Sequence, residues 1–309
     1  MKPRVHPVLA YAAVALAACA WGTWGLIVRR TDPAGAMPSA LQSTIVMAVM
    51  TAVSGVAALR DRVPGRAPGS ARAWVAWLGV SDSFNILLFF AAYKLTITVS
   101  VLTHYLTPIF VALAAPLLLR ERMTAWTAAA VVVSVGGLAL MLAPTSGAAP
   151  SAVIVTSALL GAGSAVFYAS NVLVNKLIAR HFSTSESMFW HGVVGTPLLA
   201  AFVPPSAWSA VDPRSAGWLA VAAIGPGALA GIAFVWGLRR MPAANASTLT
   251  LLEPLVSILL AAAILGERLE ARAIAGGALI LGGAVVVMRQ QAAPSNPGPI
   301  DRPGAAKAR

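Results

Sequence analysis

Long apolar runs separated by short polar connectors account for most of this chain. A helix needs about 20 residues to cross a bilayer, and ten runs approach that length. They lie near 8–28, 38–59, 73–93, 98–119, 124–142, 152–175, 187–203, 216–238, 244–265 and 271–288. In lipid, backbone polar groups must be paired within the segment itself, which makes helices the expected form for runs of this length. The pattern predicts an all-α integral membrane protein with ten transmembrane helices.

The apolar pattern also occurs twice. The block Leu106–Arg122 returns 146 residues later as Leu252–Arg268, and the glycine pair at 136–137 returns at 282–283. A fixed offset indicates two homologous halves, which in membrane proteins are typical of secondary transporters. We predict a first five-helix repeat over 1–143, a linker over 144–151, a second five-helix repeat over 152–288 and a disordered basic tail over 289–309.

Composition supports a membrane protein and narrows the chemistry. Hydrophobic residues make up 58% of the chain and charged residues 10%, whereas a soluble domain carries roughly 25% charged residues. The net charge of +12 resides in short loops and tails beside the apolar runs, so we expect contact with anionic lipid and no nucleic-acid partner. A single cysteine, Cys19, excludes an internal disulfide and a cysteine-based metal site.

The N-terminal run has an alternative interpretation. Residues Leu16–Cys19 match a lipoprotein cleavage box and follow two basic residues and a short apolar stretch. The apolar stretch nevertheless continues past Cys19 to Val28, without the polar tether that a lipoprotein shows. We therefore interpret 8–28 as the first transmembrane helix.

The distribution of Lys and Arg predicts the orientation. With the N-terminus inside, 16 of them lie on the cytoplasmic side and 6 on the outer side. The positive-inside rule then places both termini in the cytoplasm. We expect the protein to lie in the cytoplasmic (inner) membrane. Because each half has an odd number of helices, the second half enters the membrane inverted relative to the first.

Several of these features resemble a known family. The blocks "LTPIFVALAAPLLLRER" and "LEPLVSILLAAAILGER", the Trp21-Gly22 pair and the ten-span layout resemble the drug/metabolite transporter superfamily, EamA-like family. The resemblance extends over nearly the whole chain. It implies a carrier that often exports amino acids or other small metabolites. It also implies a central cavity between two five-helix bundles, lined largely by helices three, four, eight and nine.

Ionisable side chains inside the apolar runs are the candidate substrate-binding residues. Asp82 lies near the middle of the third run, with Asn85 one turn further along the same face. His104 and Tyr105 occupy the fourth run, and Glu253 occupies the ninth. An ionisable residue at that depth costs about 3 kcal/mol or more, so function is the default hypothesis.

Two prolines accompany these side chains. Pro108 and Pro254 occupy equivalent positions of the two repeats, and each proline frees the carbonyl one turn back. Paired interruptions of this kind indicate a transporter binding site, so we predict that both prolines are hinges. Glu253 aligns with Thr107, an asymmetry that an asymmetric ligand would require. Three further aromatic residues are candidates to line the cavity: Trp21, Tyr168 and Trp236.

Structural roles for the same residues remain open. Glu253 is also compatible with an interhelical hydrogen-bond anchor that never touches substrate. His104 is also compatible with a side chain that satisfies a freed carbonyl in a packed interior. His191, near the start of the seventh run, lies closer to an interface and is a weaker candidate.

The predicted function is a secondary transporter that exports a small metabolite. Buried carboxylates favour a cationic partner, so an amino acid or amine-like compound is the leading substrate, with lipophilic cations or a sugar-type solute as alternatives. Proton-coupled transport and facilitated transport without coupling are both compatible with the sequence. An enzyme would need a HExxH pair, a Gly-x-Ser-x-Gly motif or a similar constellation, none of which occurs. A scaffold would need a larger soluble face. We expect no cofactor or metal, and a monomer.

Overall fold

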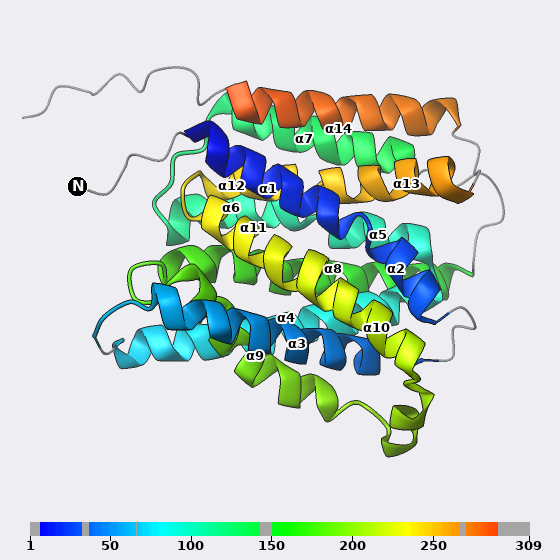
Figure 1. The fold of residues 1–309 in the computed structure, drawn as a ribbon. Coiled ribbons are helices and arrows are strands. Elements are labelled where there is room, and N and C mark those ends of the chain that lie inside the picture. The colour runs from blue at the N-terminus through cyan, green and yellow to red at the C-terminus, as the bar shows by residue number, and fades with distance from the viewer. Residues whose placement is uncertain (1–6, 33–36, 66, 143–149, 266–269, 290–309) are drawn as a thin grey trace, which may run out of the picture.

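A computed structural model describes residues 7–32, 37–65, 67–142, 150–265 and 270–289, and this part of the chain is helical without a strand (Figure 1). The elements of the first half are α1 (Pro7–Trp21), α2 (Trp24–Thr31), α3 (Ser39–Asp61), α4 (Gly69–Leu95), α5 (Ile97–His104), α6 (Thr107–Leu118) and α7 (Ala125–Met141). Those of the second half are α8 (Ser151–Leu177), α9 (Thr184–Ala200), the 3₁₀ helix η1 (Pro205–Ala210), α10 (Pro213–Ala222), the π-helical turn η2 (Ala223–Leu229), α11 (Ala230–Leu238), α12 (Ala243–Leu249), α13 (Leu252–Leu265) and α14 (Ala271–Arg289).

Eight helical stretches within these ranges are long and apolar enough to cross a membrane. The two remaining runs form α7 and α9, of 17 residues each, at the lower end of the spanning range of about 17–25. The predicted all-α membrane protein is therefore confirmed, while the count of ten spans stays a prediction. The predicted tail beyond Arg289 and most of the linker lie outside the described residues.

Two spans are broken at equivalent points. The stretch 97–118 is interrupted between α5 and α6 at 105–106, and the stretch 243–265 between α12 and α13 at 250–251. Pro108 has no N–H to donate to the carbonyl of His104, and the Thr107 hydroxyl donates to that carbonyl instead, at 2.8 Å. Before Pro254, the carbonyl of Thr250 accepts the N–H of Glu253 at 3.0 Å. The breaks therefore lie directly before the prolines that the sequence singled out.

Small residues bring the helices close together. On α7, a Cβ at Gly137 would come within 2.7 Å of the carbonyl oxygen of Gly276 on α14. The two helices lie side by side at one edge of the molecule (Figure 1). Elsewhere α4 packs against both α8 and α9, α1 packs against α11, and α3 packs against α9. The start of α1 and the end of α14 lie on the same side of the molecule, at the left in Figure 1.

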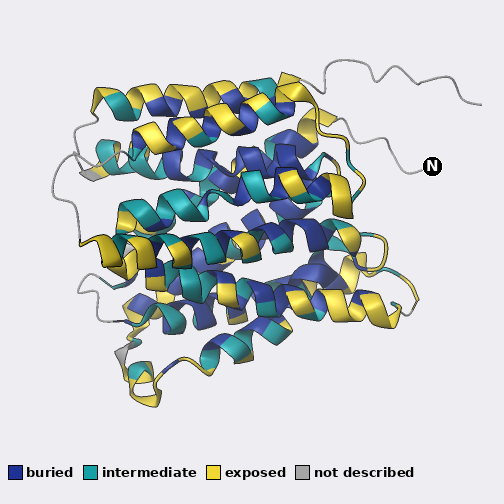
Figure 2. Ribbon diagram, turned by 180° about the vertical axis from the view of Figure 1, so that it is seen from behind, coloured by how far each residue is buried: buried dark blue, intermediate teal, exposed yellow. Residues whose placement is uncertain are grey.

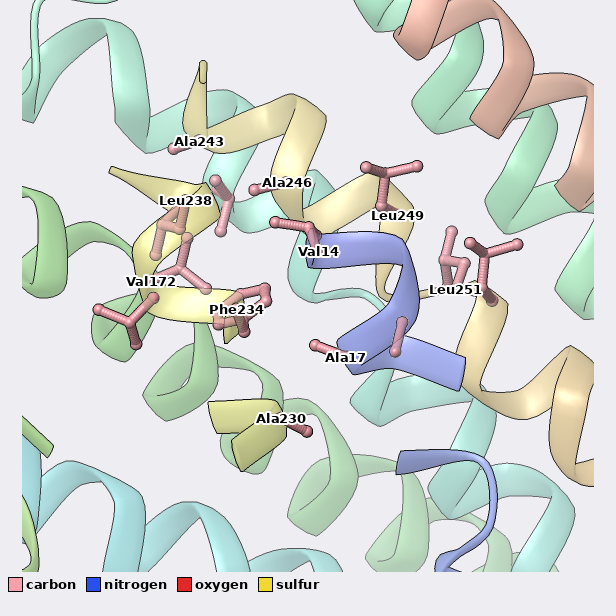
Figure 3. Close-up of a cluster of buried hydrophobic side chains, with 14 of the residues drawn as sticks. Val14, Ala17, Val172, Ala230, Phe234, Leu238, Ala243, Ala246, Leu249 and Leu251 are labelled. Atoms are coloured by element: carbon pink, nitrogen blue, oxygen red, sulfur yellow. The ribbon is translucent and has the colours of Figure 1, made fainter. Parts of the chain in front are cut away.

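The apolar core lies where helices of both halves meet. Figure 3 shows Val14 of α1, Val172 of α8, Phe234 of α11 and Leu249 of α12 converging on one cluster, and all four are buried. Exposed residues gather on the outward faces and at the ends of the helices (Figure 2). Many of the outward residues are large and apolar, such as Leu117, which is 81% exposed. Such a surface is suited to lipid rather than to water.

A polar network joins the two halves at the side where α12 begins. The Glu121 carboxylate, just after α6, accepts the N–H of Ala243 at the start of α12 at 2.7 Å. It also forms an ion pair with Lys176 at the end of α8. The ammonium of Lys176 in turn donates to the carbonyl of Met241 at 2.5 Å. Glu121 thus caps a helix of the other half, where an acidic group is stabilising.

Candidate functional site

Three helices meet at the carboxylate of Asp82, in the middle of α4. Its Oδ1 accepts hydrogen bonds from the side-chain amides of Asn85, at 3.2 Å, and of Asn171 on α8, at 3.0 Å. Its Oδ2 lies 3.0 Å from Nε2 of His191 on α9. The Asp82 side chain is 19% exposed and that of His191 11%. The carboxylate therefore has polar partners on its own helix and on both α8 and α9.

His191 and Asn171 contact the Asp82 carboxylate, a role that the sequence did not predict for either residue. The sequence ranked His191 low because it lies near the start of an apolar run, and it did not single out Asn171. Only the packing of α9 and α8 against α4 brings both side chains to Asp82. A polar side chain with an amide or imidazole inside an apolar run was the available signal in each case.

A chain of hydrogen bonds leads from Asp82 to His104. The Ser164 hydroxyl on α8 lies 2.8 Å from Oδ1 of Asn85 and 2.9 Å from the main-chain oxygen of the same residue. The same hydroxyl lies 2.8 Å from Nδ1 of His104, the last residue of α5. Asp82, Asn85 and His104, three predicted site residues, are thus connected through a serine that was not predicted.

Aromatic rings surround His104. The Tyr168 ring stacks on the imidazole with a centroid distance of 5.4 Å and an interplanar angle of 5°. Tyr105 meets it edge-on at 5.1 Å, and Phe89 lies tilted against it at 4.6 Å. The imidazole therefore has a polar contact through Nδ1 and contacts with three aromatic rings.

Glu253, the second residue of α13, lies close to the two tyrosines. Tyr105 and Tyr168 are both close enough to its carboxylate to interact with it electrostatically. Tyr168 interacts electrostatically with Asp82 as well. Within the described ranges, Glu253 forms no ion pair. The structure therefore brings six of the predicted site residues into one region: Asp82, Asn85, His104, Tyr105, Tyr168 and Glu253.

The two predicted tryptophans, like Tyr168, pack against the buried cluster that contains Tyr105, and their polar contacts are with other groups. The indole N–H of Trp21 donates to the carbonyl of Pro226 at 2.8 Å, and its ring lies 5.0 Å from that of Phe234. The Trp236 ring lies 4.1 Å from the guanidinium carbon of Arg240, near the end of its span. Trp21 thus joins α1 to η2 and α11, and Trp236 contacts a residue one turn further along the chain.

The Trp21-Gly22 pair nevertheless affects the site through its glycine. A Cβ on Gly22 would come within 2.8 Å of the carbonyl oxygen of Glu253 and of the Val256 side chain. The absence of a side chain at Gly22 lets α1 approach α13 at the point where Glu253 is held. Pro108 and Pro254 are both buried beside the same region.

The described residues contain no group of three His, Cys, Asp or Glu side chains placed to hold a metal ion. The centre consists instead of two carboxylates, two imidazoles, amides and phenols inside a bundle of apolar helices. Such an arrangement can bind a polar or cationic solute between helices, or exchange a proton.

These features define a multi-pass membrane protein with a polar centre inside its helices. The chain belongs to the EamA-like transporter family, whose model matches residues 8–143 and again 155–289. An uncharacterized transporter of Archaeoglobus fulgidus is 26% identical over 216 residues, which is 69% of this chain and 75% of that protein. One crystal structure superimposes with a TM-score of 0.74 at 23% identity, covering 90% of this chain and 97% of the other, and supports the fold. The protein is a membrane transporter.

Proposed function

We propose that this transporter exports a small amine-bearing metabolite, such as an amino acid, across the cytoplasmic membrane. The observation that carries the proposal is Glu253, a carboxylate within a membrane span that forms no ion pair among the described residues and has two phenols close to it. A carboxylate at such depth is stabilised by a cationic ligand or by a proton. Asp82 adds a second carboxylate to the same region, paired with His191.

Lipophilic cations form a second candidate substrate class. The rings of Phe89, Tyr105 and Tyr168 lie around His104, and the two tyrosines also face Glu253. Aromatic faces attract organic cations as well as ammonium groups. A sugar-type solute has less support, because it would leave the Glu253 carboxylate without a compensating charge.

For the architecture, we propose ten spans arranged as two inverted five-helix repeats. Several packing pairs support this arrangement because they have counterparts under the sequence repeat. The pair α4–α8 corresponds to α11–α1, and the pair α4–α9 corresponds to η2–α3. The helix breaks at 105–106 and 250–251 correspond to within one residue as well. Rocking of the two bundles about the polar centre would then give alternating access.

Transport assays test the substrate class directly. Inside-out vesicles that contain the protein are expected to accumulate at least one isotope-labelled amino acid or monoamine above vesicles with the Glu253→Gln variant. The panel should include sugars and lipophilic cations at equal concentration. Accumulation of the sugars alone would contradict the amine proposal, and accumulation of the lipophilic cations alone would favour the second candidate.

The inverted topology predicts which residues can be reached from outside. In a Cys19→Ala background, Ser70→Cys at the start of α4 should stay unlabelled by an impermeant maleimide in whole cells. Glu270→Cys before α14 should be labelled, because it lies on the outer side in this arrangement. Both positions are exposed in the structure, so burial does not explain a difference. Labelling at 70 without labelling at 270 would reverse the orientation.

A further inference from the structure

The hydrogen bonds between Asp82 and Ser164 have one consistent direction. An ionised carboxylate only accepts, so Asn85 must present its NH₂ group to Asp82, as the 3.2 Å contact from Nδ2 indicates. The other end of this amide, Oδ1, therefore faces Ser164 and accepts its hydroxyl at 2.8 Å. The main-chain oxygen of Asn85, at 2.9 Å from the same hydroxyl, is likewise only an acceptor.

This direction fixes the proton on His104. Ser164 has a single hydroxyl hydrogen and uses it toward Asn85, so its oxygen accepts from Nδ1 of His104 at 2.8 Å. The His104 ring forms no ion pair with a carboxylate in the described part of the chain, which favours the neutral imidazole. A neutral ring protonated on Nδ1 has a free lone pair on Nε2.

The free nitrogen is available to a ligand. Among the described residues, Nε2 of His104 has no hydrogen-bond partner. This nitrogen is not fully buried, so a ligand can reach it. The ring is half-buried between Tyr168 and Tyr105, the two phenols that also interact with Glu253. A free hydrogen-bond acceptor therefore lies against two phenols, and the same phenols interact with the Glu253 carboxylate.

We propose that Nε2 of His104 accepts an N–H from the ammonium group of the transported substrate, while the Glu253 carboxylate supplies the compensating charge. This inference rests on the proposed amine function and adds a specificity to it. The site should prefer a primary ammonium, which has N–H donors, to a fully methylated ammonium of equal charge. Ser164 then acts as a positioning residue, because it holds the imidazole in the tautomer that leaves Nε2 free.

Two probes separate the hydrogen bond from the charge. Phenethylamine carries both an N–H donor and a positive charge, and its N,N,N-trimethyl derivative carries only the charge. We expect the wild-type protein in proteoliposomes to transport the primary amine at least about tenfold better in kcat/KM. A hydrogen bond to a charged group is strong enough to give that ratio.

Two isosteric substitutions of His104 serve as a matched pair. In His104→Asn, the amide takes the place of Nδ1, so the bond to Ser164 can persist while the acceptor at the Nε2 position is lost. In His104→Gln, the amide reaches the Nε2 position and can still offer an oxygen. The preference for the primary amine should fall to about onefold in His104→Asn, persist in part in His104→Gln, and decrease in Ser164→Ala. Melting temperatures in detergent show whether each variant is folded.

The outcomes distinguish the two proposals. If wild type prefers the primary amine and His104→Asn keeps that preference, the role of His104 is wrong while the amine function stands. If wild type carries both ammonium probes equally, substrate recognition uses charge alone, and the inference is again wrong. If wild type carries neither probe nor any amine of the panel, the proposed function itself fails, and the inference fails with it.

Discussion

Replacement of Asp82 by Asn should abolish most transport while the protein still inserts into the membrane. The amide keeps the shape of the carboxylate but removes the charge that pairs with His191 at 3.0 Å. It also offers Asn85 and Asn171 a group that donates as well as accepts, so the direction of the hydrogen bonds toward Ser164 is no longer fixed. Losing a hydrogen bond to a charged group costs about 1.5–3 kcal/mol, which predicts at least roughly a tenfold loss of kcat/KM.

Asp61 provides the control for this substitution. It lies at the end of α3, outside the middle of the membrane, and also accepts two side-chain hydrogen bonds, from Ser183 at 3.0 Å and Ser185 at 3.1 Å. Asp61→Asn should leave transport within about twofold of wild type, because exposed polar pairs contribute little. Transport by Asp82→Asn that matches wild type at every pH tested would make Asp82 a structural residue and weaken the amine proposal.

The apolar pattern alone predicted most of the helices, because a membrane span is a long and unambiguous signal. Each of the ten runs is helical over most of its length. The prolines also indicated the breaks in two spans, since a missing N–H has a local effect that sequence can show. The π-helical turn η2 was not predicted, although it contains Pro226. The hydrogen-bond pattern of this turn depends on how the span packs against α3 and α1, which the local sequence does not determine.

The sequence identified several residues of the candidate site but not the hydrogen bonds that connect them. The depth of Asp82, His104 and Glu253 along their runs identified them as unusual. The partners Asn171, Ser164 and His191 come from helices far away in sequence, and their selection depends on which helix faces meet. Without that packing, His191 was indistinguishable from a residue near an interface.

Replacement of Pro108 or Pro254 by Ala should slow transport without preventing insertion. Alanine restores an N–H, which can bond to the carbonyl of His104 or of Thr250 and continue the helix through the break. At Pro108, the Thr107 hydroxyl would then compete with the new N–H for the carbonyl of His104. Because the broken spans carry His104, Tyr105 and Glu253, a straighter helix would displace their side chains and stiffen the movement of the bundles. We expect kcat to fall on the order of tenfold for each variant, about 1.4 kcal/mol in the barrier.

Pro116 in α6 is the matched control for these two prolines. It lies in the same broken span as Pro108 but is exposed, and its counterpart under the repeat is Ala262, so one half already functions with alanine there. Pro116→Ala should therefore transport at nearly the wild-type rate, which separates a general effect of proline loss from an effect at the break. Single-turnover counterflow in proteoliposomes measures the rate of reorientation independently of substrate affinity. Wild-type rates in both Pro108→Ala and Pro254→Ala would show that the breaks serve packing and that the movement of the bundles does not depend on them.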